Sequence, residues 1–177
     1  MKNLTIRPLE SRDVAPISEA FSEVGWKNKP RSQYERYLSE QQIGIRAVLV
    51  AFVRGEFAGY LTINWNTIYQ PFRDRGIPEI QDFNVLPRFR WQGVGTSLMD
   101  TAERKVYERS SVAGIGVGMS PGYGAAQRLY VLRGYVPDGK GLTYEGCIVE
   151  QGDEITVNDG LVLYLTKTLP SDRRRGV

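Results

Sequence analysis

The chain has 177 residues and an ordinary balance of hydrophobic (41%) and charged (24%) side chains, which predicts one folded domain over residues 1–177 with its own core. The net charge is only +3, so the sequence gives no reason to expect a nucleic-acid partner, and we expect the basic residues 171–177 to form a frayed tail. With one cysteine and no histidine, the sequence excludes an internal disulfide and a Ser-His-Asp or Cys-His mechanism, and it predicts no metal site.

The first half of the chain alternates between strand and helix patterns. A strand is predicted at residues 4–8, and apolar residues spaced by threes and fours predict helices at 11–25 and 31–44. Two β-rich runs around the segment RGEF (54–57) predict a hairpin across residues 45–67. Residues 69–78 carry two prolines and several charges, and we expect a polar loop there.

The second half alternates more regularly. A strand is predicted at 79–86, a helix from 93 to about 109, a glycine-rich strand at 112–119 and a helix at 123–134 that ends at Gly134. Residues 135–141 are expected to be a strand end and a turn, and 159–169 a last strand. This order indicates a mixed α/β sheet with helices on both faces. Since no signal peptide and no membrane-length apolar run is visible, we expect a cytoplasmic protein without a membrane partner.

The seam between the strand at 79–86 and the helix after it has the features of an anion site. Arg90 and Gln92 are followed by Gly93 and Gly95, just where the helix is expected to begin. Backbone N–H groups at a helix start attract anions, and glycines there allow a phosphate to approach closely. The pattern lacks the Gly-Lys-Ser/Thr of a Walker loop and the third glycine of a dinucleotide fingerprint. The plain alternative is a helix start on a surface turn.

Two motifs resemble the GNAT superfamily of acyl-CoA-dependent N-acetyltransferases. RWQGVG (90–95) matches its (Gln/Arg)-x-x-Gly-x-(Gly/Ala) loop, and AAQRLYVLRGY (125–135) is similar to its A-x-x-LY-x-x-x-GF helix and strand. The order of elements also matches, so the resemblance covers nearly the whole chain. It implies a mixed, mostly antiparallel central sheet with helices on both faces and a splay between two parallel central strands.

The resemblance also implies a binding site for acetyl-CoA. Val85 and Leu86 would pair with the pantetheine arm, and Arg90 would add a positive charge. Tyr123 stands where the family often has Asn, which leaves that contact with CoA open. The residues whose backbone would hold the pyrophosphate are Gln92, Gly93, Val94, Gly95 and Thr96.

The catalytic groups follow from the same resemblance. Tyr130 matches the tyrosine of the "LY" pair, where it would protonate the leaving thiolate, although it could instead be an aromatic core residue. The general base is left open between Glu79, Asp82 and a water: by alternation the two carboxylates lie on opposite faces of their strand, unless a bulge intervenes. The glycines of GIGVG (114–118) could be packing positions or could make room for the acyl group.

The resemblance therefore predicts an N-acetyltransferase for a primary amine of a small molecule or peptide, by direct attack in a ternary complex, with a homodimer as one possible assembly. Aromatic residues before the strand at 79–86 could form an acceptor wall or belong to the core; they are Trp26, Tyr34, Tyr37, Trp65, Tyr69 and Phe72. One alternative is a GNAT-like module that binds acyl-CoA without turnover. Another is a nucleotide-binding domain, which would bind ATP or NAD instead.

Overall fold

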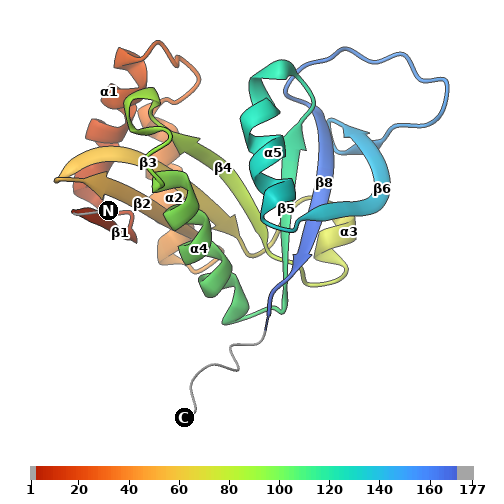
Figure 1. Cartoon of the computed structure of the whole chain (residues 1–177), viewed down its shortest axis with the longest axis horizontal. Coiled ribbons are helices and arrows are strands. Elements are labelled where there is room, and N and C mark those ends of the chain that lie inside the picture. The colour runs from red at the N-terminus through yellow and green to blue at the C-terminus, as the bar shows by residue number, and fades with distance from the viewer. Residues whose placement is uncertain (1–2, 171–177) are drawn as a thin grey trace. The chain divides into compact units, whose positions relative to one another are not determined.

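The computed structural model describes residues 3–170, which form two compact units (Figure 1). The first unit runs from the first described residues to Asn66 and includes Ile80–Lys105. The second comprises Thr67–Glu79 and the described residues from Val106 onward. The tail expected at 171–177 lies outside the described residues. No helix among residues 3–170 has the length and apolar character needed to cross a membrane.

The first unit contains four neighbouring strands in the order β1-β2-β3-β4. Its strands are β1 (Leu4–Pro8), β2 (Arg46–Val53), β3 (Glu56–Asn64) and β4 (Glu79–Val85), of which Glu79 falls in the second unit. Its helices are η1 (Ser11–Asp13), α1 (Val14–Glu23), α2 (Arg31–Gln42), η2 (Pro87–Phe89) and α4 (Val94–Tyr107), of which the last two residues fall in the second unit. The strand at 4–8, both N-terminal helices and the helix after the seam are thereby confirmed.

The β2–β3 hairpin forms where the sequence predicts it. Val53 pairs with Glu56, and the two turn residues between them, Arg54 (φ 53°) and Gly55 (φ 83°), both have left-handed backbone conformations. A two-residue turn with positive φ at both positions matches the twist of the flanking strands.

The core of the first unit has helices on two sides of its strands. On one side, Phe21 of α1, Tyr34 of α2 and Tyr60 of β3 are fully buried and contact one another ring to ring. On the other, α4 contributes Leu98, Met99 and Ala102, which are all fully buried; Val106, also predicted to face inward, is fully buried too but falls in the second unit.

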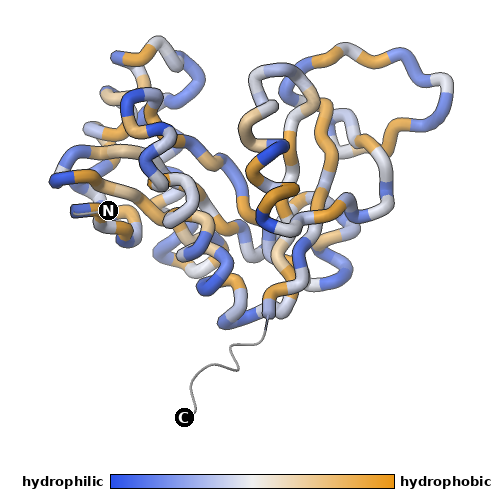
Figure 2. Tube along the Cα trace, in the orientation of Figure 1, coloured by the Kyte–Doolittle hydropathy of each residue, from blue (hydrophilic) through white to orange (hydrophobic). Residues whose placement is uncertain are grey.

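The second unit is an antiparallel set of strands in the order β5-β8-β6-β7. Its elements are α3 (Gln70–Arg73), β5 (Val112–Gly118), η3 (Pro121–Tyr123), α5 (Gly124–Leu132), β6 (Val136–Tyr144), β7 (Cys147–Ile148) and β8 (Leu161–Thr168). Hydrophobic residues run along β5 and β8, which pair with each other (Figure 2). Gly134 (φ 85°) follows the end of α5, as predicted.

Two predictions for the second unit are wrong. The polar loop expected at 69–78 contains the short helix α3, whose Phe72 is fully buried with Tyr69 and Ile77. The turn expected at 135–141 lies within β6, which pairs with β8 on both sides of a register shift between Pro137 and Leu142. Gly139 and Gly141 have positive φ inside that shift, so the glycines interrupt the strand without ending it. The fold class, mixed α/β with mostly antiparallel strands, is confirmed; the splay stays a prediction.

Candidate functional site

The loop before α4 has the backbone shape of an anion site. Trp91 (φ 61°) and Gly93 (φ 77°) are left-handed, and the chain then enters α4 at Val94, which is buried. The first N–H groups of a helix have no partner within the helix and carry partial positive charge. Gln92 and Thr96 are exposed beside them, so these N–H groups start a helix at the surface of the first unit. This arrangement can bind a phosphate.

The two glycines of the loop also have structural roles. Gly93 has a left-handed backbone conformation that L side chains rarely adopt. A Cβ at Gly95 would lie 3.0 Å from Cζ of Phe83, so Gly95 lets the first turn of α4 pack closely on β4. Both glycines are therefore required by the fold itself, in addition to any ligand.

The end of β4 offers one of the two backbone positions predicted for pantetheine. The Leu86 N–H donates to the Ala58 carbonyl at 2.9 Å, and the Leu86 carbonyl accepts from Phe89 at 2.9 Å, so both groups are engaged within the unit. The Val85 carbonyl accepts a hydrogen bond from Nε of the exposed Arg90 at 3.2 Å. Arg90 also lies over the Trp26 ring, 5.6 Å from its centroid. Because the Arg90 guanidinium is exposed and can move away, the Val85 carbonyl can become available to a ligand. The two Leu86 backbone groups are held by bonds within the fold.

Asp82 is the centre of a dense hydrogen-bonded cluster. Its carboxylate forms an ion pair with Lys29 and accepts hydrogen bonds from Gln33 at 2.6 Å, from Tyr37 at 3.0 Å and from the buried Tyr60. The side-chain amide of Asn84 adds a bond of 2.8 Å. We call this cluster the Asp82 cage; its members are Lys29, Gln33, Tyr37, Tyr60, Asp82 and Asn84.

An irregularity in β4 turns Asp82 toward this cage. Asp82 has a φ of 50°, which interrupts the alternation of the strand. Gln81 accepts a bond from Arg46 at 3.1 Å, and the Arg46 guanidinium lies 4.6 Å from the centre of the Tyr37 ring. The next residue, Asp82, bonds the hydroxyl of that same Tyr37. Consecutive side chains therefore reach the same side of the strand, which regular alternation would forbid.

The cage keeps Asp82 ionised. Burial alone would raise the pKa of Asp82, but the charge of Lys29 and the hydrogen bonds from Lys29, Tyr60 and Tyr37 lower it below its ordinary value. Burial and the nearby Asp82 charge raise the pKa of Tyr37 to about 12. A carboxylate that is stabilised in this way binds a cation well and takes up a proton poorly.

Glu79 lies in a different environment in the second unit. Its side chain is 4% exposed and accepts a hydrogen bond from the buried Thr67. Burial, followed by the negative charges of Glu79 and Asp138, raises the pKa of Tyr164, whose ring stacks on Tyr69 at 3.6 Å between centroids. Glu79 is thus a buried carboxylate whose charge acts on the nearby Tyr164 hydroxyl.

Tyr130 and Tyr123 lie at the α5 end of the second unit. Tyr130 is 4% exposed, its ring packs beside Tyr135, and burial raises the pKa of its hydroxyl well above the ordinary value. Tyr130 therefore stays protonated through neutral pH. The Tyr123 hydroxyl donates to Asp159 at 3.1 Å. The Tyr123 hydroxyl thus has a hydrogen-bond partner within the chain. It need not bind CoA in place of the asparagine that the family often has at this position.

The glycines of β5 are packing positions. A Cβ on Gly114 would collide with the Phe72 ring, and one on Gly118 would come within 2.5 Å of the Tyr123 ring. A Cβ on Gly116 would meet Tyr164 at 3.0 Å. Aromatic side chains therefore fill the space over these glycines, which favours the packing interpretation over room for an acyl group.

The aromatic residues expected as an acceptor wall mostly belong to the two cores. Tyr34 and Tyr37 are buried in the first unit, and Tyr69 and Phe72 in the second. Lys29, Gln33 and Tyr60 were not predicted as site residues, because their bonds to Asp82 span up to 53 residues of chain. A motif of local spacing cannot reveal such contacts.

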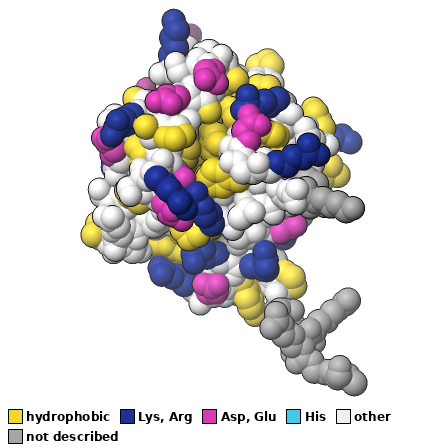
Figure 3. Space-filling model, turned by 90° about the vertical axis from the view of Figure 1, so that its left-hand side faces the viewer, with side chains coloured by type: hydrophobic (Ala, Val, Ile, Leu, Met, Phe, Trp, Pro, Cys, Tyr) yellow, Lys and Arg dark blue, Asp and Glu magenta, His cyan; other side chains and the backbone are white. Residues whose placement is uncertain are grey.

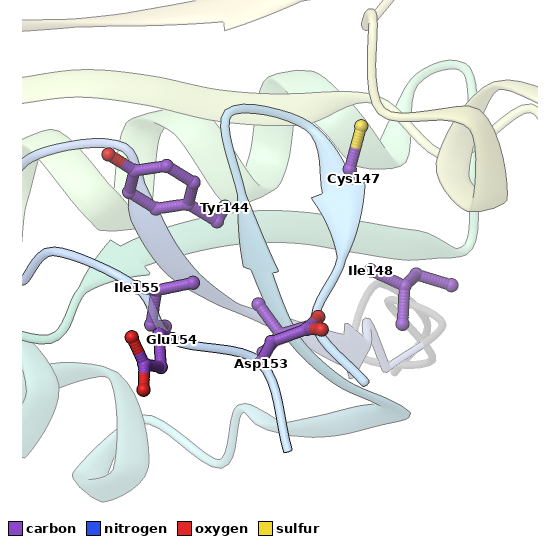
Figure 4. Close-up of a pocket in the computed structure, with 7 residues that line it drawn as sticks. Tyr144, Cys147, Ile148, Asp153, Glu154 and Ile155 are labelled. Carbon is purple, nitrogen blue, oxygen red and sulfur yellow. The ribbon is translucent and has the colours of Figure 1, made fainter. Parts of the chain in front are cut away.

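A cavity of about 240 Å³ lies in the second unit around β7. Tyr144, Cys147, Ile148, Asp153, Glu154 and Ile155 line it together with Val149, and the residues predicted for an acyl-CoA site are not among them (Figure 4). Over residues 3–170 there is no cluster of Cys, Asp and Glu that could hold a metal ion. On the face shown in Figure 3, basic and acidic side chains are interspersed with exposed hydrophobic ones.

The comparisons with known proteins agree on one family. The family model of the Acetyltransferase (GNAT) family matches residues 13–135. An uncharacterized N-acetyltransferase of Archaeoglobus fulgidus is 34% identical over 95 residues, which are 52% of this chain and 60% of that protein. The match thus spans less than two thirds of that relative's length.

Solved structures share the fold at low sequence identity. An acetyltransferase that modifies the N-terminal serine of ribosomal protein L7/L12 in Salmonella typhimurium has a TM-score of 0.71 at 12% identity, covering 96% of this chain and 97% of that one. A second Salmonella typhimurium protein, solved with its cofactor acetyl-CoA, has a TM-score of 0.68 at 18% identity over 96% and 95% of the two chains. A chimera of Vibrio cholerae spermidine N-acetyltransferase has a TM-score of 0.65 at 17% identity over 93% and 95%.

Proposed function

Because this chain belongs to the GNAT family of acetyltransferases, we propose that it transfers the acetyl group of acetyl-CoA to a primary amine. The amine nitrogen attacks the thioester carbonyl, the C–S bond breaks, and the CoA thiolate leaves. The ammonium first loses one proton to a base and becomes the neutral amine; the nitrogen loses a second proton as the amide forms, and the thiolate takes up a proton from an acid. The products are the N-acetylated amine and CoA.

The observation that carries this proposal is the loop before α4. Trp91 and Gly93 bend the backbone so that a helix N-terminus opens at the surface, inside the segment that matches the family's pyrophosphate motif. In the proposal, the N–H groups from Gln92 to Thr96 hold the pyrophosphate and Arg90 adds charge. The Val85 carbonyl bonds the pantetheine, after Arg90 releases it.

We propose Glu79 as the base, acting directly or through a water. Glu79 is the first residue of β4, and its carboxylate is buried. Asp82 is the second candidate, but the cage lowers its pKa and occupies its oxygens. The variants Glu79→Gln and Asp82→Asn separate the two candidates. If Glu79 is the base, Glu79→Gln alone removes the acidic limb of the turnover profile against pH, where protonation of the base lowers the rate, and a profile changed only in Asp82→Asn would reverse the assignment.

We propose Tyr130 as the acid, on the strength of the motif position that it occupies. Its hydroxyl remains protonated at neutral pH, because burial raises its pKa. The relatives do not fix the acceptor: one acts on a protein N-terminus, and another is named for spermidine. The proposal therefore covers both small-molecule and peptide amines.

Turnover with a panel of amines tests the proposal. Release of free thiol from acetyl-CoA, together with the mass of the acetylated amine, is expected for at least one amine in the panel. A second candidate function is an acyl-CoA-binding module without turnover, since the loop alone would suffice for it. Stabilisation by acetyl-CoA without thiol release from any amine would favour that module. Stabilisation by ATP and not by acetyl-CoA would contradict both functions.

A further inference from the structure

The Asp82 cage already holds a primary ammonium group, that of Lys29. The Lys29 ammonium pairs with the Asp82 carboxylate and donates to the Tyr60 hydroxyl at 3.3 Å. It also lies 5.7 Å from the centre of the Tyr60 ring, within the range of a cation–π contact. A carboxylate, a hydroxyl and an aromatic ring around one ammonium are the groups that a binding site for such a cation would use.

The other members of the cage prepare Asp82 for a cation. Gln33, Tyr37, Tyr60 and Asn84 all donate to the carboxylate. These donors stabilise the ionised form, and the ionised form in turn stabilises a positive charge beside it. An amine held in the cage is therefore kept protonated. A protonated amine has no free electron pair, so it cannot be the nucleophile of an acyl transfer.

Lys29 can exchange with a group from solution. It lies in the segment between α1 and α2, where its backbone carbonyl is fixed by a 3.0 Å bond from Ser18. The Lys29 and Asp82 side chains are each 16% exposed, so the ion pair reaches the surface. The lysine stem is flexible, and its ammonium is easily hydrated. Replacement by another primary ammonium would conserve both the charge and the hydrogen bonds of the cage.

We propose that the Asp82 cage is an ammonium-binding subsite, which Lys29 fills in the free protein and a second, non-reacting ammonium group of the acceptor fills during the reaction. The acceptor is then an amine with two cationic groups: one is anchored at Asp82, and the other is acetylated. The part about the acceptor rests on the function proposed above, whereas the ammonium site does not. Lys29 acts as an internal competitor that lowers the apparent affinity for such amines.

The binding part is tested without catalysis, by thermal unfolding in propylammonium chloride. Propylammonium should raise the Tm of Lys29→Ala in a saturable way, because it fills the place of the missing ammonium. At equal ionic strength, tetramethylammonium should not, since it cannot donate hydrogen bonds. The wild type should respond to propylammonium only at higher concentrations, because Lys29 competes for the site, and Lys29→Ala/Asp82→Asn should respond to neither salt. Equal Tm shifts in all three proteins would overturn the subsite.

If Lys29→Ala does not fold, the wild type supplies the readout. The NMR signal of the Lys29 ammonium should move toward that of a solvent-exposed lysine as 1,4-diaminobutane is added. A signal that stays unchanged at saturating diamine would overturn the exchange. Since Asp82→Asn removes the anion, its Lys29 signal should already resemble that of exposed lysine.

The acceptor part is tested by comparing KM for 1,4-diaminobutane and butylamine, a matched pair that differs in one amino group. Lys29→Ala should lower KM for the diamine by about tenfold, because an internal competitor is gone, and leave KM for the monoamine unchanged. Equal changes for both amines would overturn the two-cation acceptor. Acetylation of no amine, together with propylammonium binding to Lys29→Ala, would refute the proposed function while supporting the subsite.

Discussion

The hydroxyl of Tyr60 on β3 donates a hydrogen bond to the carboxylate of Asp82 on β4, and Tyr60 is fully buried. Burial and the Asp82 charge raise the pKa of Tyr60 well above its ordinary value. The hydroxyl therefore keeps its proton at neutral pH and can donate it in a hydrogen bond. This bond ties the irregular residue of β4 to the neighbouring strand.

Replacing Tyr60 by Phe should destabilise the protein. The carboxylate loses one donor but keeps its other partners, so we expect a loss of about 1 to 3 kcal/mol in the free energy of unfolding in urea. Tyr107→Phe is the matched control, since Tyr107 is 38% exposed, and it should change stability by less than about 0.5 kcal/mol. Equal losses of stability in the two variants would show that the Tyr60–Asp82 hydrogen bond does not stabilise the protein.

The Asp82 carboxylate predicts a pH dependence of stability. The pKa of Asp82 is lower in the folded protein than in the unfolded chain, so its contribution is fully present above the unfolded value and is lost as pH falls through the folded one. Asp82→Asn should therefore cost on the order of 3 kcal/mol at pH 7, because Lys29 loses its partner, and clearly less at pH 3. Urea unfolding at both pH values measures the difference. A cost that does not depend on pH would contradict it.

Because Phe72 packs directly over Gly114, even an alanine at position 114 should destabilise the protein. The added Cβ of Gly114→Ala would clash with the fully buried Phe72 ring, and we expect a loss of about 1 to 3 kcal/mol in the free energy of unfolding. Gly124→Ala is the control: Gly124 is the first residue of α5 with nothing within 4 Å of an added Cβ, and alanine should be neutral or stabilising there. Thermal unfolding compares them. A tolerated Gly114→Ala would instead favour space left for a ligand.

Local pattern predicted much of the fold. The β2–β3 turn was visible in RGEF, because a two-residue turn needs left-handed residues, and the inward face of α4 was visible in the spacing of its apolar residues. A helix was predicted to begin at Gly93 within RWQGVG, and α4 begins one residue later at Val94.

Features that depend on tertiary contacts were not predictable in the same way. The sequence around α3 is polar, and its one buried residue, Phe72, stands among charged neighbours. The burial of Phe72 is explained by its contact with β5, which the local sequence does not reveal. β6 was hidden by Gly139 and Gly141, which interrupt a strand that pairing with β8 maintains. The Asp82 cage joins the segment before α2 to β3 and β4, and no sequence pattern links them.

The variant Tyr130→Phe distinguishes a role of Tyr130 as the acid from a role as a core residue. Loss of the hydroxyl should lower kcat by about 10²-fold, because the thiolate then leaves without its acid, while the Kd for acetyl-CoA changes little. Tyr130 is buried, so the Tm of the variant is measured alongside. A fall in Tm with equal losses in kcat and acetyl-CoA affinity would assign Tyr130 to the core.

The most direct test of the central claim is the Kd of acetyl-CoA, measured by calorimetry for the wild type, Gly93→Glu and Gly44→Glu. Gly93 (φ 77°) and Gly44 (φ 80°) share a backbone conformation, so both variants carry the same strain and the same added charge. We predict that Gly93→Glu weakens binding by about tenfold or more, because a carboxylate then faces the pyrophosphate, while Gly44→Glu binds like the wild type. Equal acetyl-CoA affinity in all three proteins would contradict a CoA site at the start of α4.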